Sequence, residues 1–122
     1  MINQKPIVYE KLKELQDNGT VKDVCEEGKQ DWSKLPCITY MELGNEPSDY
    51  GDDEEYSSAL AIKADVWGKA SSSEVSKIAI QVVKKMKELG YERTLYLDVN
   101  DSNSKQNHKT MRFEKEESLE EE

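Results

Sequence analysis

Two segments of the chain carry apolar residues at helical spacing. The first starts near Pro6, which suits an initial helical turn, and stops at Asn18-Gly19. Its narrow apolar stripe consists of Val8, Leu12 and Leu15. This spacing predicts a short helix with one apolar edge.

The second helical segment is the longer of the two. Ser71 and Glu74 have the spacing of a capping box at its start, and Gly90 ends it. Its apolar positions fall on one face: Val75, Ile78, Ala79, Val82, Met86 and Leu89. Ile80 lies roughly 140° from Val75 at 100° per residue, so it points elsewhere. We interpret Ile80 as either flexible surface or a contact to another chain.

Alternation with a period of two predicts the strands. It runs from Pro36 to Leu43, from Tyr56 to Trp67, from Tyr91 to Val99 and from Gln106 to Glu116. The second strand is the clearest, with Leu60, Ile62, Ala64 and Val66 on one face and Ala61, Lys63, Asp65 and Trp67 on the other. The first face reads as buried and the second as mixed.

These elements predict an α+β fold. We expect an antiparallel sheet of about four strands, with two main helices packed on one face. Residues 1–113 are expected to form a single domain and residues 114–122 an acidic, disordered tail. Residues 20–35 are ambiguous: Val21 to Val24 fit a short strand, and Trp32 and Leu35 fit anchors of the following loop.

Composition narrows the class of protein. The chain has 122 residues and 35% hydrophobic residues, enough for a small core but not for a large internal pocket. Neither a membrane-spanning apolar run nor a signal peptide is expected. Cys25 and Cys37 are not spaced as a metal-binding pair, and they favour a reducing compartment over a disulfide framework.

The formal charge of -9 is concentrated in two places. The segment 44–56 holds six acidic residues and no basic one, and the segment 114–122 holds six glutamates against Lys115. Such runs are typically solvated, which predicts an acidic loop and a frayed tail. They also suit a passage to which DNA does not adhere. Basic residues interleaved with aromatic ones are missing, so no nucleic-acid partner is expected.

No pattern predicts catalysis or a cofactor. The string from Asp98 to Asn103 opens like a calcium loop, but its sixth position is not glycine and its twelfth, Lys109, is not glutamate. His108 has no partner among its neighbours in sequence, which favours a surface histidine. We therefore expect no enzyme, no metal ligand and no bound cofactor.

Large aromatic residues on strands leave two interpretations open. Tyr40 and Trp67 either pack under a helix or sit in a contact between subunits, where such side chains are favoured. Both interpretations are compatible with the alternation of these strands.

The order of these segments resembles the tail-terminator or tail-completion (head-to-tail joining) proteins of long-tailed bacteriophages and prophages. The resemblance covers roughly residues 35–115 and depends on order and style more than on an invariant motif. It is carried by the strings Leu35-Pro36-Cys37-Ile38-Thr39-Tyr40, Ala64-Asp65-Val66-Trp67-Gly68-Lys69, Met86-Lys87-Glu88-Leu89-Gly90-Tyr91 and His108-Lys109-Thr110-Met111-Arg112-Phe113.

The resemblance implies a structural role. Members of that family form a ring, commonly a hexamer, which ends the tail tube and faces the head connector. The implied partners are further copies of the chain, the tail tube protein and the connector protein. The implied locations are the host bacterial cytoplasm during assembly and then the tail particle.

A ring needs two different surfaces on each subunit. The candidates for the contact between subunits are Ala61, Lys63, Asp65, Trp67 and Ile80. The candidates for loop contacts above or below the ring are Asp49, Tyr50, Asp52, Asp53, Asp98, Asn100 and Asp101. We also expect Trp67→Ala to weaken assembly more than folding.

Two hypotheses of other classes remain. A monomeric acidic adaptor or inhibitor of a basic partner protein would suit the charge equally well, and a stable one-to-one complex would favour it. A small metal-dependent hydrolase using the segment from Asp98 to Asp101 is the other. Unchanged stability on adding calcium or zinc would exclude it.

Overall fold

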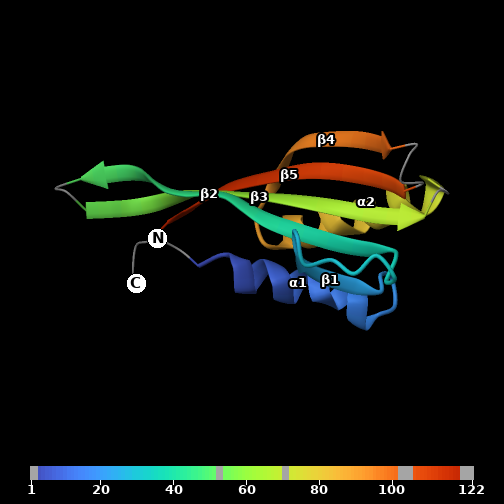
Figure 1. Cartoon of the computed structure of the whole chain (residues 1–122). Helices are drawn as coiled ribbons and strands as arrows, with labels where there is room; N and C mark the ends of the chain where they lie inside the picture. Colours follow the sequence, from blue (N-terminus) through green and yellow to red (C-terminus); the bar gives the residue numbers. More distant parts are fainter. Residues whose placement is uncertain (1–2, 52–53, 70–71, 102–105, 119–122) are drawn as a thin grey trace.

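A computed structural model describes residues 3–51, 54–69, 72–101 and 106–118 (Figure 1). Within them it has two helices and five strands. The order is α1 (Lys5–Asp17), β1 (Asp23–Glu26), β2 (Cys37–Gly51), β3 (Glu54–Lys69), α2 (Ser72–Glu88), β4 (Glu92–Asp101) and β5 (Gln106–Ser118). The α+β class and both helices are therefore confirmed.

The described strands form one sheet in the order β1-β2-β3-β5-β4. All neighbouring strands are antiparallel except β1, which pairs parallel to β2 with Val24 opposite Ile38. The expected antiparallel sheet of about four strands therefore gains a short fifth, parallel strand. Residues 27–36 carry the chain from the end of β1 back to the start of β2, as a parallel pair requires.

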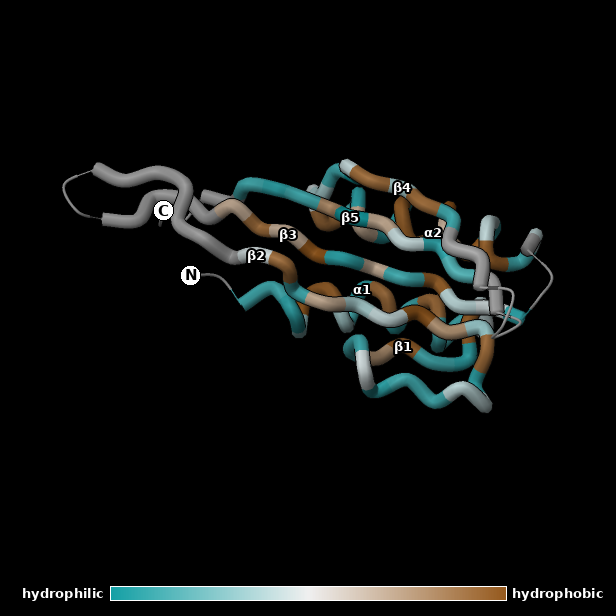
Figure 2. Tube along the Cα trace, turned by 45° about the horizontal axis from the view of Figure 1, so that its top comes forward, coloured by the Kyte–Doolittle hydropathy of each residue, from teal (hydrophilic) through white to brown (hydrophobic). Residues whose placement is uncertain are grey.

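Both helices pack on one face of the sheet, where the core lies (Figure 2). α1 contributes its apolar edge, and α2 contributes the face that its sequence predicts. Opposite them lie the buried strand residues Val24, Ile38, Tyr40, Leu60, Ile62, Ala64, Val66, Met111 and Phe113. Tyr40 thus packs in the core, with its ring 6.2 Å from that of Tyr9. Burying each large apolar side chain contributes roughly 1.5–3 kcal/mol, which fixes the face of each strand.

The end of α2 follows the glycine signal. Gly90 has a φ of 92°, and its N–H donates to the carbonyl of Lys87 at 2.9 Å. The N–H of Tyr91 donates to the carbonyl of Met86 at 3.1 Å, which completes a Schellman motif. The expected cap at Ser71 lies outside the described residues.

Strand pairing continues into the acidic segment that was expected to be a loop. β2 and β3 stay paired to Gly51 and Glu54, and only residues 52–53 between them lie outside the described part. We call residues 44–51 and 54–60 the acidic ribbon (Figure 1). The expectation of a loop is wrong because backbone hydrogen bonds between two strands do not require buried side chains. Asp49 and Tyr50 are therefore strand residues, whereas Asp52 and Asp53 lie outside the described residues.

The C-terminal hairpin is also longer than its pattern predicts. β4 continues through Asp98, Asn100 and Asp101, so these three candidates for loop contacts are strand residues. β5 continues to Ser118, which pairs with Ser57, in place of a disordered segment from residue 114. Residues 119–122 lie outside the described part.

Gln4 connects the start of α1 to the sheet through side-chain hydrogen bonds. Its buried amide donates to Glu42 Oε2 at 3.0 Å and to the Gly44 carbonyl at 2.9 Å. Its oxygen accepts a hydrogen bond from the Tyr91 hydroxyl at 2.5 Å. These bonds hold the base of the acidic ribbon against both helical segments.

Gly68→Ala is expected to lower the free energy of unfolding by about 1–3 kcal/mol, because it overpacks the contact between β3 and α2. A Cβ atom at Gly68 would lie 2.4 Å from Val75 Cγ2, a branched side chain with little freedom to move. Gly44→Ala is the matched control, since its Cβ would meet Ala61 at an ordinary 3.9 Å. Urea unfolding of both variants checks this, and equal stability of the two would contradict it.

Candidate functional site

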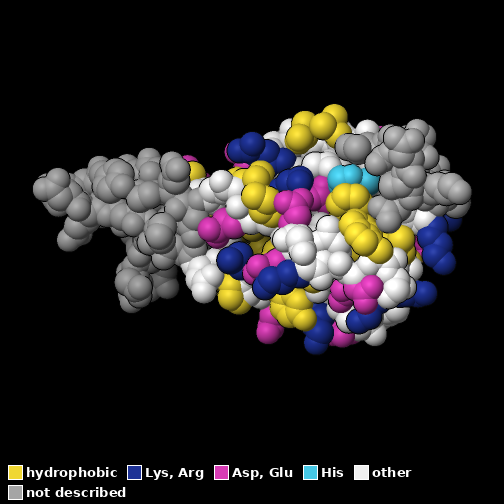
Figure 3. All heavy atoms as spheres, in the orientation of Figure 1, with side chains coloured by type: hydrophobic (Ala, Val, Ile, Leu, Met, Phe, Trp, Pro, Cys, Tyr) yellow, Lys and Arg dark blue, Asp and Glu magenta, His cyan; other side chains and the backbone are white. Residues whose placement is uncertain are grey.

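Among the described residues, no helix covers the face of the sheet that lies opposite α1 and α2. We call it the open face. In its centre the strand register places Asp65 opposite Thr110 and Lys63 opposite Arg112. Several large apolar side chains around this centre are 41–50% exposed: Trp32, Met41, Leu95 and Leu97. Figure 3 shows apolar, acidic and basic side chains interspersed around the histidine.

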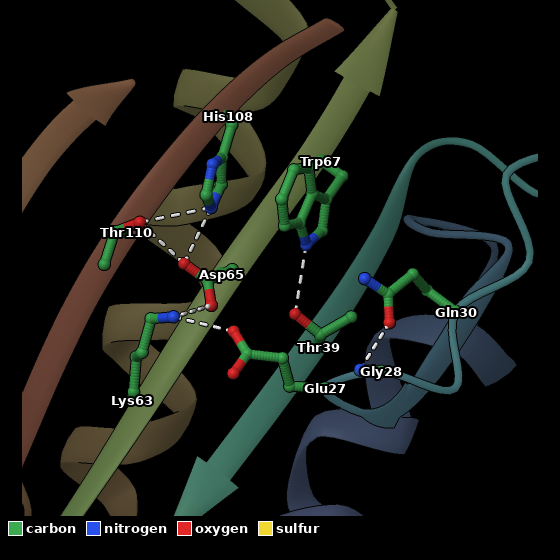
Figure 4. A network of polar contacts seen from close by, with 9 residues as sticks. All are labelled: Glu27, Gly28, Gln30, Thr39, Lys63, Asp65, Trp67, His108 and Thr110. Carbon is green, nitrogen blue, oxygen red and sulfur yellow. Dashed lines mark hydrogen bonds and ion pairs between the residues drawn. The ribbon is translucent and has the colours of Figure 1, made fainter. Parts of the chain in front are cut away.

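The centre of the open face is a buried carboxylate (Figure 4). The Asp65 side chain is 1% exposed. Its Oδ1 lies 2.7 Å from His108 Nε2 and accepts a hydrogen bond from Thr110 Oγ1 at 2.6 Å. An ionised carboxylate only accepts hydrogen bonds, so the Nε2 of His108 carries the proton it donates. Two residues of β5, His108 and Thr110, therefore bond the same oxygen of Asp65 on β3.

A chain of charges continues from Asp65 along β3. Lys63 Nζ lies 3.3 Å from Asp65 Oδ2 and donates to Glu27 Oε1 at 2.6 Å. Asp65 Oδ2 accepts no hydrogen bond within the described residues, so the Lys63 charge is what compensates it.

These contacts set the protonation of both groups. Burial raises the pKa of Asp65, but the hydrogen bonds from His108 and Thr110 and the charge of Lys63 outweigh it, so this pKa lies below its ordinary value. Burial lowers the pKa of Lys63, but Glu27 and Asp65 outweigh it and raise that pKa. Both groups are therefore ionised near neutral pH.

Aromatic rings cover one side of this polar cluster. The indole of Trp67 stacks on the His108 ring, with 3.6 Å between centroids and 11° between planes. Its Nε1 donates to Thr39 Oγ1 at 3.0 Å. Trp32 meets Trp67 edge-on with centroids 5.0 Å apart. We call Glu27, Lys63, Asp65, Trp67, His108 and Thr110 the open-face cluster.

The loop after β1 carries Glu27 and Trp32, which contact Lys63 and Trp67 on the open face. Gly28 has a φ of 95°, and its N–H donates to Gln30 Oε1 at 2.6 Å. This turn places Glu27 beside Lys63 (Figure 4). The chain then continues to Trp32, whose ring meets that of Trp67 edge-on. The sequence predicted Trp32 as a loop anchor, and the structure shows that its anchor point is Trp67.

The candidates for the contact between subunits lie on two surfaces. Lys63, Asp65 and Trp67 meet on the open face, as their spacing predicts. Ala61 is buried at the base of the acidic ribbon, opposite Gly44 and Glu114. Ile80 is 53% exposed on α2, in the layer on the other side of the sheet. The role of these residues in a contact stays a prediction.

His108 has a partner that its sequence neighbours do not reveal. Asp65 stands 43 positions earlier, on another strand, and the register between β3 and β5 brings the two together. The available signal was an acidic residue between buried Ala64 and Val66, since a carboxylate in such a strand needs a partner.

The open-face cluster does not have the geometry of a nucleophilic triad. In a triad the imidazole stands between hydroxyl and carboxylate and takes the proton of the hydroxyl. Here Thr110 donates directly to Asp65, and the same carboxylate oxygen engages His108 Nε2. In this arrangement His108 Nε2 does not act as a base towards Thr110.

The cysteines do not provide a nucleophile either. Burial is the main cause that raises the pKa of Cys25 to about 11 and that of Cys37 to about 12. Near neutral pH both thiols are protonated and therefore weakly reactive.

The described ranges contain neither a metal-binding group of side chains nor a membrane-spanning helix. No group of three histidine, cysteine, aspartate or glutamate side chains there is arranged to hold a metal ion. Neither described helix has the length and apolar character needed to cross a bilayer.

Comparison with known proteins relates the fold to a phage protein. No protein-family model matches the chain. No curated protein matches it either. Among solved structures, the bacteriophage SPP1 gp17 protein is similar in fold, with a TM-score of 0.53 and 17% sequence identity over 89% of this chain and 86% of that one. The chain therefore shares nearly its whole fold with a bacteriophage protein.

Proposed function

We propose that this chain is a structural subunit of a bacteriophage or prophage tail. In this role it assembles as a ring, caps the tail tube and joins it to the head connector. Its partners are further copies of itself, the tail tube protein and the connector protein. Asp49, Tyr50, Asp52, Asp53, Asp98, Asn100 and Asp101 remain candidates for the contacts above or below the ring.

The observation that carries the proposal is the open face. Exposed Met41, Leu95 and Leu97 surround a cluster whose polar groups are already paired. Apolar side chains beside an ordered polar centre are typical of a surface that another protein covers. Asp65 Oδ1 is bonded to His108 and Thr110, and Oδ2 faces the charge of Lys63, so a partner can cover Asp65 without breaking these contacts.

Two further observations support this class of function. The fold is shared with a bacteriophage protein, and the segments from residue 35 to 115 resemble those of tail-terminator and tail-completion proteins. The carboxylate oxygen at the centre of the open-face cluster is also bonded within the chain, to His108 and Thr110, which suits a structural role.

Antibody labelling of tail particles tests the proposal. Particles purified from an induced culture are expected to carry label at the head-proximal end of the tails. A denatured sample of the same particles, probed with the same antibody, controls for epitopes hidden in the assembly. Absence of the chain from particles while it is abundant in the cell would reject the tail role. A stable one-to-one complex with a basic protein would then favour the acidic adaptor.

A further inference from the structure

A second surface lies between α2 and β4, away from the open face. A groove of about 260 Å³ is lined there by Ile80, Val83, Lys84, Lys87, Arg93 and Tyr96. We call it the α2–β4 groove. Its apolar part is accessible, since Ile80 is 53% and Tyr96 37% exposed.

The rim of the groove is basic. Among the described residues, neither Lys84 nor Lys87 makes an ion pair, whereas Lys85 between them pairs with Glu14 of α1 at 2.8 Å. The guanidinium of Arg93 lies 4.6 Å from the centre of the Tyr96 ring. The groove thus offers three cations around an apolar floor, in a chain whose formal charge is -9.

The acidic ribbon has the complementary composition. Its two strand segments hold four acidic residues and no basic one, namely Glu46, Asp49, Glu54 and Glu55, together with Tyr50 and Tyr56. In β2 the ribbon extends roughly 23 Å from Gly44 to Gly51 at about 3.3 Å per residue. Figure 1 shows the ribbon projecting past the ends of both helices, away from α2 and β4 of its own chain.

We infer that the acidic ribbon of one copy binds in the α2–β4 groove of the next copy. The contact joins two different surfaces, so it repeats from subunit to subunit and closes a ring when the rotation allows. Opposite charges select this pairing, and Ile80 and Val83 supply apolar area beneath it. The inference rests on the proposed ring and names the contact that would build it. It places Asp49 and Tyr50 in the contact between subunits instead of above or below the ring.

Complementary charge reversal tests this contact. The groove variant carries Lys84→Glu and Lys87→Glu. The ribbon variant carries Glu46→Lys, Asp49→Lys, Glu54→Lys and Glu55→Lys, which changes the formal charge of residues 44–56 from -6 to +2. Each variant alone places like charges across the contact. In an equimolar mixture, the acidic ribbon of the first meets the basic groove of the second, and the basic ribbon of the second meets the acidic groove of the first.

The readout is the concentration dependence of amide NMR shifts at Ile80, Val83 and Tyr96 in low salt. We expect the shifts of the unmodified chain to change with protein concentration, and we expect added salt to reduce this change. Each variant alone should bind itself at least about tenfold more weakly, and the mixture should restore the shifts. Lys22→Glu with Lys77→Glu gives the same change of net charge at exposed sites outside the groove and should leave the shifts unchanged.

Shifts that do not depend on concentration in the unmodified chain would overturn the contact. A mixture that fails to restore them, or an equal loss in the control, would do the same. This outcome is separable from the tail role. Label at tail ends without charge rescue rejects only the ribbon contact, whereas rescue without label rejects only the tail role.

Discussion

Asp65→Asn is expected to lower the free energy of unfolding by about 2–4 kcal/mol at pH 7. The carboxylate accepts hydrogen bonds from His108 and Thr110 and balances the charge of Lys63. An amide of the same size cannot compensate that charge, and its NH₂ group cannot accept a hydrogen bond. Removing one member of a buried, paired cluster leaves its partners desolvated and unpaired, and this costs more stability than removing an exposed pair.

The effect should depend on pH with a definite sign. The pKa of Asp65 in the folded chain lies below its ordinary value of 3.8. Its contribution to stability is therefore fully present above that value and is lost as the pH falls through the lower folded pKa. Urea unfolding of both proteins between pH 7 and pH 2 measures the difference, which should shrink only in acid.

Glu88→Gln is the control for removing a carboxylate beside a lysine. Glu88 pairs with Lys11 at 3.4 Å, its side chain is 54% exposed, and Lys11 keeps a second partner in Glu14. The variant is expected to change stability by no more than about 1 kcal/mol. An Asp65→Asn protein as stable as the Glu88→Gln protein would contradict the structural role of the open-face cluster.

Trp67→Ala is expected to lower the free energy of unfolding by about 2–3 kcal/mol and to weaken self-association further. The substitution removes the stack on His108, the edge contact with Trp32 and the hydrogen bond to Thr39. Aromatic truncations in full cores lose more, and Trp67 is only partly buried. In the proposed ring the open face is a second contact between subunits, and the loss of self-association comes in addition because this surface loses its central aromatic side chain.

Two further variants separate folding from assembly. Trp67→Phe keeps one ring over His108 and loses the hydrogen bond to Thr39 and the second ring of the indole, so the expected loss of about 1–2 kcal/mol is smaller than for Trp67→Ala. Trp32→Ala changes a half-exposed side chain and should affect association more than unfolding. Thermal unfolding and sedimentation are measured on all three variants. Equal losses of stability and association for Trp67→Ala would refute its place in a contact.

Periodicity predicted the elements whose side chains meet the core. The face of β3 that carries Ile62 and Val66 and the face of α2 that carries Val82 and Met86 are buried as their spacing indicates. In these segments, burial of apolar area is the interaction that decides the structure, and it leaves a regular pattern in the sequence.

The acidic ribbon and β1 left no such pattern. Strand pairing in the ribbon depends on backbone hydrogen bonds, which acidic side chains such as Glu54 do not prevent. β1 has only four residues, and its parallel partner is fixed by the path of residues 27–36. Both features depend on pairing between two segments, which the hydrophobic periodicity of a single segment does not reveal.

The sequence predicted the residues of the candidate site that lie on β3 but not their partners on β5. Alternation placed Lys63, Asp65 and Trp67 on one face, and this follows from the geometry of any strand. The partners His108 and Thr110 depend on the register between β3 and β5, which a single strand does not specify. Their identity therefore came only from the assembled sheet.

The position of β5 has a consequence for folding of the chain. β5 lies between β3 and β4 in the sheet but follows both of them in sequence. Until residues 106–118 join the sheet, β3 and β4 each lack the strand that will separate them, and two backbone edges stay open to aberrant pairing. A chain that ends before Gln106 is therefore expected to bind chaperones more strongly than the full chain does.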